Sequence, residues 1–281
     1  MEPSERFQFQ TPVVDVLRMQ IAPFGARPTA ANSARFGPSA PDARTTTHIV
    51  AHRGFHDPTT YENTVDAYRR AAEIGVDLVE VDIRRTADGV LVLHHDASIA
   101  GRRISTTDFA DLPKLPNGQV ISTLQGLVDA AAGARGGTRL LVETKEFGYE
   151  AEIVNLLRSR LGASSFELMS FNHDSVRALR QLAPDAKVGV LFGLVPDWKN
   201  GTWPISGAAM VQQSRELKVD FVAIDRRIAD DGRLDALAAA GLKTAVWTVD
   251  SRIDLRRFLH DSRVYRVITD APDTAKQMRD G

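Results

Sequence analysis

Several charged residues and histidines of this sequence lie at the ends of short apolar runs, where a strand would leave a hydrophobic core. They are His52, Arg53, Glu80, Asp82, His95, Glu143 and Lys145. Three of them are carboxylates, and like charges held close together are unfavourable unless a cation offsets them. Two are histidines, which exchange protons near neutral pH. These residue types suit a metal-assisted reaction with proton transfer.

The spacing of the charged residues refines this chemistry. Glu80 and Asp82 lie two residues apart, as do Glu143 and Lys145, so each pair points to one side of an extended strand. The chain contains no cysteine, which excludes thiolate ligands and disulfides. Oxygen ligands alone suit one hard divalent cation, Mg²⁺ or Ca²⁺. Because Arg53 and Lys145 suit a phosphate anion, the set indicates cleavage of a phosphodiester.

Apolar runs alternate with helical patterns from His48 onwards. The runs are HIVAH, DLVEVDI, VLVLHH, RLLVE, FELMSF, KVGVLF, VDFVAI, KTAVWTV and YRVIT. Strands that alternate with helices of about ten residues indicate βα units and a parallel sheet. No glycine-rich dinucleotide fingerprint follows the first run, which disfavours a Rossmann fold.

The second run continues through Arg85, and only Thr-Ala-Asp-Gly then separates VEVDIRR from VLVLHH, which is too short for a parallel crossover. We therefore expect an antiparallel hairpin with Asp88 and Gly89 as a two-residue turn. That turn would place His95 opposite Asp82, to within about one residue of register, beside the carboxylates. The remaining runs predict an α/β fold, a TIM (β/α)₈ barrel with a β-hairpin and short insertion after strand 2. In such barrels the functional residues lie at the carboxyl ends of the strands.

Composition limits the possible partners. The net charge of −1 disfavours nucleic acid and anionic membrane surfaces. No apolar stretch is long enough to span a bilayer, and the first residues do not resemble a secretory signal. We expect a small-molecule substrate and a cytoplasmic location, or secretion if the true start differs. Residues 1–47, rich in Pro, Ala, Ser and Gly, predict a disordered or linker-like N-terminal extension before a catalytic domain at 48–281.

Seven segments carry a family resemblance through their order and spacing. They are HRG at 52–54, EN at 62–63, VEVDIRRTADGVLVLHHD at 79–96, ETK at 143–145, LMSFNHDSVRALRQLAP at 168–184, AVWTVD at 245–250 and VITDAP at 267–272. Together they resemble the glycerophosphodiester phosphodiesterase family. The resemblance implies a TIM barrel that uses a divalent metal ion to hydrolyse a glycerophosphodiester to glycerol 3-phosphate and an alcohol.

Carried over by position, the resemblance implies roles for individual residues. His52 and His95 would be the catalytic pair, with His52 as base and His95 as acid, although the sequence does not order them. The metal ligands would be Glu80, Asp82 and Glu143. The substrate would contact Arg53, Lys145 and Trp247, and Glu62 and Asn63 would support the site. Glu62 could equally bind the metal ion, orient Arg53 or brace the first loop.

Other readings stay open from the sequence. The same barrel chemistry would serve a phospholipase, lysophospholipase D-like or cyclising, with an apolar entry surface around Trp198, Trp203 and Ile205. A catalytically silent barrel would only bind. Asp270 reads as the N-cap of the last helix. The remaining histidines read as edge, loop or surface residues: His48, His56, His94, His173 and His260. The alcohol released, the choice between Mg²⁺ and Ca²⁺ and the oligomeric state are open.

Overall fold

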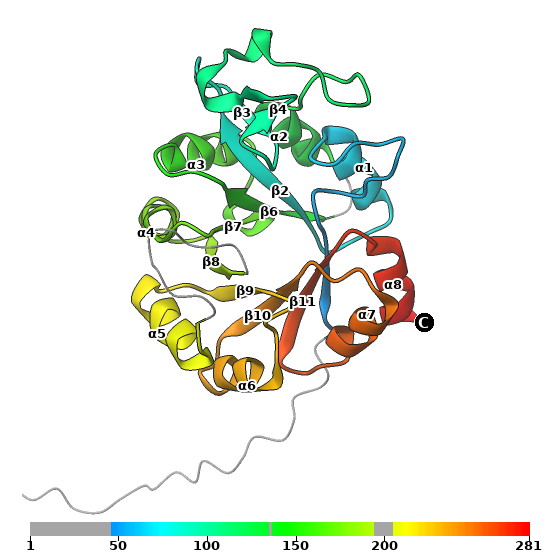
Figure 1. The fold of residues 1–281 in the computed structure, drawn as a ribbon, viewed down its shortest axis with the longest axis vertical. Coiled ribbons are helices and arrows are strands. Elements are labelled where there is room, and N and C mark those ends of the chain that lie inside the picture. The colour runs from blue at the N-terminus through cyan, green and yellow to red at the C-terminus, as the bar shows by residue number, and fades with distance from the viewer. Residues whose placement is uncertain (1–45, 135–136, 194–204) are drawn as a thin grey trace, which may run out of the picture. The chain divides into compact units, whose positions relative to one another are not determined.

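A closed ring of eight parallel strands forms the centre of the fold (Figure 1). The computed structural model describes residues 46–134, 137–193 and 205–281, so the extension expected at the N-terminus lies outside the described residues up to residue 45. The barrel strands are β1 (His48–Ala51), β2 (Leu78–Arg85), β6 (Arg139–Thr144), β7 (Phe166–Ser170), β8 (Lys187–Phe192), β9 (Phe221–Asp225), β10 (Lys243–Trp247) and β11 (Val264–Thr269). Strand β1 pairs with both β11 and β2, which closes the ring. The predicted TIM barrel is confirmed.

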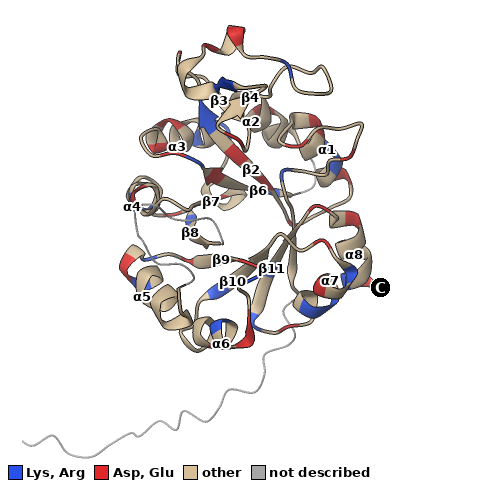
Figure 2. Ribbon diagram, in the orientation of Figure 1, with Lys and Arg blue, Asp and Glu red and all other residues tan. Residues whose placement is uncertain are grey.

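Helices connect the strands and surround the barrel. They are α1 (Val65–Glu73), α2 (Leu124–Gly133), α3 (Glu150–Arg158), α4 (His173–Leu182), α5 (Gly207–Leu217), α6 (Asp231–Ala239), α7 (Arg252–Leu259) and α8 (Pro272–Asp280). Figure 2 shows charged residues on these helices and acidic positions on β2, inside the ring of helices. Within the described ranges we find no helix with the length and apolar character needed to cross a membrane.

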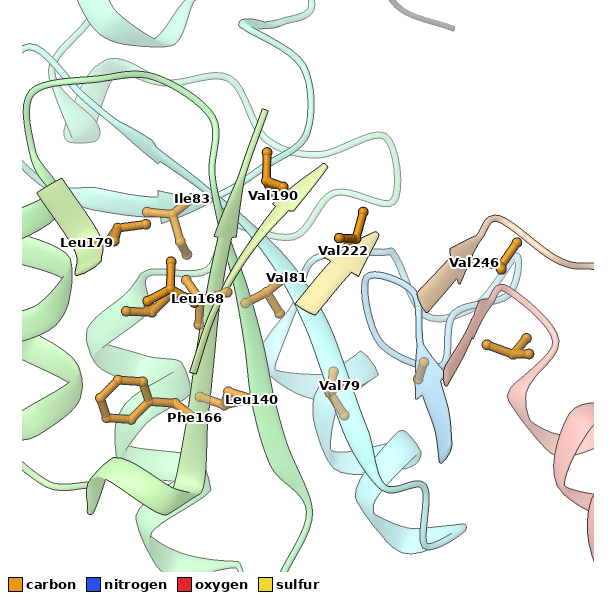
Figure 3. Packing of buried hydrophobic residues seen from close by; sticks show 14 of the residues in the cluster. Val79, Val81, Ile83, Leu140, Phe166, Leu168, Leu179, Val190, Val222 and Val246 are labelled. Carbon is orange, nitrogen blue, oxygen red and sulfur yellow. The ribbon is translucent and has the colours of Figure 1, made fainter. Parts of the chain in front are cut away.

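Strand alternation divides the barrel into two apolar layers. Val79, Val81 and Ile83 of β2 face the helices, in the larger cluster drawn in Figure 3. Leu78, on the other face of β2, packs inside the barrel with Ile268 of β11 and other inward-facing residues. Successive strand residues point to opposite faces, so the inward face that begins at Leu78 continues through the two acidic residues of β2. The packing of Leu78 inside the barrel therefore directs the side chains of Glu80 and Asp82 toward the barrel interior.

The hairpin after β2 differs from its prediction by one residue. Strand β3 (Leu91–Leu93) pairs Ile83 with Leu93 and Arg85 with Leu91. The amide of Thr86 donates to the carbonyl of Val90, and the amide of Gly89 donates to the carbonyl of Thr86. The turn therefore has three residues between Thr86 and Val90, a common hairpin loop with glycine in the left-handed conformation. The predicted two-residue turn is wrong, and His94 rather than His95 lies opposite Asp82, a shift that the predicted register range of about one residue includes.

A short insertion follows the hairpin, as predicted. It contains β4 (Ser98–Ile99), β5 (Arg102–Arg103) and two short 3₁₀ turns (Ile104–Thr106 and Phe109–Asp111). Its own apolar cluster joins Ile99, Ile104 and Ile121 to Val92 of β3. The insertion therefore packs on the hairpin that carries His95.

The amino end of the barrel contains a buried ion cluster. Arg266 is fully buried, and its Nη2 lies 2.6 Å from Glu167 Oε2. Glu167 also binds Arg139 at 2.9 Å and Lys187 at 3.4 Å. The Arg266 guanidinium lies over the ring of Phe221, 5.1 Å from its centroid. One carboxylate thus serves three basic groups at the end opposite the candidate site.

Candidate active site

A cavity of about 900 Å³ opens at the carboxyl ends of the barrel strands. Every residue that the sequence predicted for catalysis, metal binding or substrate binding lines it. Glu62 and Asn63 lie behind this lining, where they contact Arg53 and Asp82 respectively. The structure therefore brings together residues from strands and loops that are far apart in the sequence.

Three buried carboxylates line one side of the cavity. Oxygens of Glu80, Asp82 and Glu143 all lie within 4.8 Å of one another, and Asp82 stands opposite Glu143 in the β2–β6 register. Burial, reinforced by the charges of Asp82 and Glu143, raises the pKa of Glu80 well above its usual range. Burial also raises the pKa of Glu143, although Lys145 opposes this shift. A divalent cation would relieve the repulsion, so this donor set fits Mg²⁺ or Ca²⁺.

Asp82 stays ionised at the centre of this cluster. Burial disfavours its charge, but Lys145 and Arg53 outweigh that effect and lower the pKa of Asp82 to about 2. Lys145 Nζ lies 2.7 Å from Glu143 Oε1 and 3.3 Å from Asp82 Oδ1. Asn63 donates from its side-chain amide to Asp82 Oδ2 at 2.9 Å and accepts from the Asp82 amide at 3.0 Å. The Asp82 carboxylate is therefore held from two directions.

Arg53 ties the first loop to the carboxylates. It adopts a left-handed conformation with φ of 55°, which costs a non-glycine residue about 1–3 kcal/mol. In that conformation its amide donates to Glu80 Oε2 at 2.9 Å. Its Nη1 donates to both oxygens of Glu62, at 2.9 and 3.1 Å, and its Nε lies 3.3 Å from Asp82 Oδ2. Of the readings that the sequence left open for Glu62, this geometry favours the orientation of Arg53.

Gly54 lets the loop turn directly against α1. Its φ is +86°, and a Cβ at this position would lie 2.6 Å from the Cβ of Ala67 and 2.7 Å from that residue's carbonyl carbon. The next amide, of Phe55, donates to the carbonyl of Ala67 at 2.9 Å. Only glycine combines this conformation with so close an approach.

Asp270 orients His52, so its predicted role as a helix cap is wrong. Helix α8 starts at Pro272 with Ala271 at its cap position. Asp270 Oδ1 instead lies 2.7 Å from His52 Nδ1 and 3.2 Å from His56 Nε2. Burial disfavours the charge of Asp270, but these two contacts hold its pKa below its usual range. An ionised Asp270 accepts the Nδ1 proton of His52, which leaves Nε2 of the neutral ring as a proton acceptor.

His95 has a similar arrangement on the other side of the cavity. Its Nδ1 lies 2.8 Å from Oδ1 of the neighbouring Asp96. Burial and the positive charge of Lys145 lower the pKa of His95 below its usual value. Although the hairpin register places the His94 amide against the Asp82 carbonyl, the His95 side chain still lines the cavity.

Aromatic side chains form the opposite wall. The rings of Trp247 and Phe171 meet edge to face, with centroids 5.6 Å apart. The indole also covers Gly193, where a Cβ would lie 2.7 Å from it. Phe147 stands beside the cavity with 56% of its surface exposed. Of the apolar loop proposed from sequence, Ile205 lines this wall, whereas Trp198 and Trp203 lie outside the described residues.

Sequence reasoning missed several residues around this site. The sequence predicts a plain loop position for His56, but this residue shares Asp270 with His52. The signal was barrel closure: β1 pairs with β11 and the His52 amide donates to the Thr269 carbonyl at 2.9 Å. Among the other histidines, His48 pairs with Asp77 at the amino end of the barrel, His94 is buried, His173 lines the cavity and His260 is exposed.

Comparison with known proteins gives this arrangement a family context. Residues 52–274 match the model of the glycerophosphoryl diester phosphodiesterase family. A glycerophosphodiester phosphodiesterase of Caldanaerobacter subterraneus subsp. tengcongensis is 26% identical over 260 residues, covering 81% of this chain and 96% of the relative. A probable glycerophosphodiester phosphodiesterase 2 of Mycobacterium tuberculosis is 28% identical over 242 residues, covering 82% of this chain and 89% of the relative.

Solved structures show the same fold. A glycerophosphodiester phosphodiesterase from Parabacteroides distasonis aligns with a TM-score of 0.72 at 24% identity, covering 85% of this chain and 98% of that one. A phosphodiesterase from Oleispira antarctica, in complex with the product sn-glycerol-3-phosphate, aligns with a TM-score of 0.71 at 21% identity, covering 84% and 98%. The family match and the barrel agree with the expectation of a phosphoric diester hydrolase. The chain belongs to the glycerophosphoryl diester phosphodiesterase family.

Proposed function

We propose that this chain is a metal-dependent phosphodiesterase that hydrolyses a glycerophosphodiester to glycerol 3-phosphate and an alcohol. Residues 48–281 would form its catalytic domain and residues 1–47 an N-terminal extension. The observation that carries the proposal is one cavity that contains three buried carboxylates and two histidines, each hydrogen-bonded to an aspartate. Family membership and the glycerol phosphate bound to the Oleispira antarctica relative support a small-molecule substrate.

The carboxylate cluster would hold one divalent cation, Mg²⁺ or Ca²⁺, through Glu80, Asp82 and Glu143. A cation bound there supplies polarisation of a phosphate oxygen and offsets the negative charge of the transition state. Arg53 and Lys145 would bind the remaining phosphate charge. Both side chains form ion pairs with Asp82 of the cluster, so their positive charges lie beside the carboxylates, where the phosphate would bind.

The two histidines would move the protons. His52 would take a proton from the attacking hydroxyl or water as its oxygen bonds to phosphorus, and His95 would give a proton to the leaving alkoxide as that bond breaks. The assignment of His52 as base is supported by Asp270, whose charge stabilises the imidazolium that forms. Asp96, whose Oδ1 lies 2.8 Å from His95 Nδ1, would hold this imidazole in place and stabilise its protonated form.

A lysophospholipid is the second candidate substrate, favoured by the apolar wall. Trp247, Phe171, Phe147 and Ile205 offer more apolar surface than a glycerol group requires. An acyl chain could lie along this wall while the phosphodiester reaches the carboxylates. Side-by-side turnover of glycerophosphocholine and lysophosphatidylcholine separates the two substrate classes.

The proposed function is tested with a panel of glycerophosphodiesters assayed for released glycerol 3-phosphate, with chelator and then with Mg²⁺ or Ca²⁺ restored. We expect turnover that disappears with chelator and returns with one of these ions. Glu80→Ala should abolish it without unfolding the protein, whereas Glu73→Ala, an exposed position on α1, should not. Absence of turnover with either ion, together with absence of metal binding in calorimetry, would instead indicate a silent barrel.

A further inference from the structure

One arginine, Arg84, binds the backbone carbonyl of His95. Strand β3 ends at Leu93, and His95 follows in an irregular bend. Arg84, near the end of β2, donates from Nε at 2.9 Å and from Nη2 at 2.6 Å to the carbonyl oxygen of His95. A planar guanidinium that binds through two nitrogens fixes the direction of its partner as well as its distance. The Arg84 side chain is only 10% exposed.

The guanidinium is in turn fixed by the loop after β6. Arg84 Nη1 forms an ion pair with Glu146, the residue after Lys145. The Tyr149 hydroxyl lies 3.2 Å from Glu146 Oε2 and 3.0 Å from the carbonyl oxygen of Ile83. Burial, with Glu146 beside it, raises the pKa of Tyr149, so the phenol remains a proton donor. We call Arg84, Glu146 and Tyr149 the Arg84 latch.

The latch connects two parts of the proposed catalytic machinery. At one end, Arg84 donates to the backbone carbonyl of His95. At the other end, Arg84 pairs with Glu146, the residue that follows Lys145. Without Arg84, the His95 carbonyl would lose both donors that the described residues offer it. The bend would then be free to move, and proton transfer is sensitive to displacements of about 1 Å. The side chain of Arg84 borders the cavity, but its nitrogens are engaged with the protein.

We propose that Arg84 is a positioning residue for His95, holding the imidazole where it can protonate the leaving alkoxide. The inference rests on the proposed function for the role of His95. It makes a selective prediction, because a substrate whose leaving group needs no proton does not depend on the position of His95. Glycerophosphocholine, which releases an alkoxide, requires that proton. A p-nitrophenyl phosphodiester, which releases a stable phenolate, does not.

The experiment is a double-mutant cycle of Arg84→Met and His95→Ala on both substrates. Arg84→Met should lower kcat for glycerophosphocholine roughly 10- to 100-fold, a part of the usual contribution of a general acid, with little change in KM. The loss on the p-nitrophenyl ester should stay within threefold. In the His95→Ala background, Arg84→Met should cause no further loss, because residues that act as a unit are not additive.

Arg85→Met is the matched control on the same strand. Arg85 forms an ion pair with Glu152 at 2.7 Å and lies over the Tyr149 ring at 5.6 Å, and neither contact involves His95 or Arg84. This variant should keep wild-type kcat on both substrates. An equal loss for Arg84→Met on the two substrates, or an undiminished loss without His95, would overturn the positioning role.

Failure of the proposed function would look different, since the wild-type protein would then turn over neither substrate. A second measurement decides the positioning role in that case. In protein with ¹⁵N-labelled histidine, Arg84→Met should shift or broaden the imidazole resonances of His95 and leave those of His52 in place. Unchanged His95 resonances would show that Arg84 does not position it.

Discussion

Asp270→Asn removes the negative charge beside His52 while keeping the size of the side chain. His52 Nδ1 lies 2.7 Å from Asp270 Oδ1, and a hydrogen bond to a charged group contributes about 1.5–3 kcal/mol. As the proposed base, His52 becomes positively charged in the transition state and would lose this support. Because ~1.36 kcal/mol corresponds to a tenfold change in rate, loss of the whole hydrogen bond would lower kcat roughly 10- to 150-fold. Asp270 is 41% exposed, so solvent screening places the expected loss of kcat near 10- to 30-fold.

The assay compares kcat and KM for a glycerophosphodiester that the wild-type protein hydrolyses. KM should stay the same, since Asp270 does not line the cavity and acts through His52. Affinity for the divalent ion, measured by calorimetry, should also be unchanged. Asp273→Asn is the control, because it removes a carboxylate in the first turn of α8 without touching His52. His56→Gln should have a smaller effect than Asp270→Asn, since its contact is longer, 3.2 Å.

A kcat within twofold of wild type in Asp270→Asn would refute the reasoning, because the 2.7 Å contact would then carry no catalytic consequence. A raised KM with normal kcat would also refute it, since that pattern marks lost ground-state binding. Thermal unfolding of the variant should be recorded in parallel, so that loss of folded protein is not mistaken for loss of rate.

Three further predictions concern the metal cluster and the barrel. The raised pKa of Glu80, caused by burial and its acidic neighbours, means that metal binding must displace a proton, so calorimetry in two buffers should show proton release and affinity that weakens as pH falls. Gly54→Ala should lower the free energy of unfolding by roughly 2–4 kcal/mol through strain and overlap with α1, whereas Gly89→Ala, with a similar φ but nothing within 4 Å, should cost less. Glu167→Gln should cost roughly 3–5 kcal/mol in denaturant unfolding, because it leaves Arg266 buried without its counter-charge; a loss below 1 kcal/mol would contradict that account.

Two sequence patterns predicted the barrel and the carboxylate cluster. They are the alternation of apolar runs with helical segments and the spacing of two residues between charged positions at the strand ends. Residues two apart on a strand share a face, so Glu80 and Asp82 had to point the same way. The parallel neighbour β6 then placed Glu143 opposite Asp82. The shared face of Glu80 and Asp82 follows from the sequence pattern alone, whereas the position of Glu143 opposite Asp82 comes from the register of the sheet in the structure.

The hairpin register could not be predicted because one side chain decides it. Thr86 Oγ1 accepts from the Val90 amide at 2.9 Å and lies 2.5 Å from Asp88 Oδ1. These contacts favour a three-residue loop over the shorter Asp-Gly turn that the dipeptide suggested. The change of one residue moves His94 to the position opposite Asp82, so His95 reaches the cavity from an irregular bend. A bend needs an external support, and only the structure identifies Arg84 as that support.

The misreading of Asp270 has a more general physical cause. A residue between a strand and a helix has two competing partners, the amides of the helix that follows and the strand beside it in the sheet. The sequence shows only the first of these, and Asp-Ala-Pro at a helix start favours a cap. Barrel closure supplies the second, because β1 pairs with β11 with Ala51 opposite Thr269. His52 and Asp270 directly follow the ends of these two strands, so they leave the sheet side by side. For any closed barrel, the residues after the first and last strands should accordingly be considered as a pair before either is assigned to its own helix.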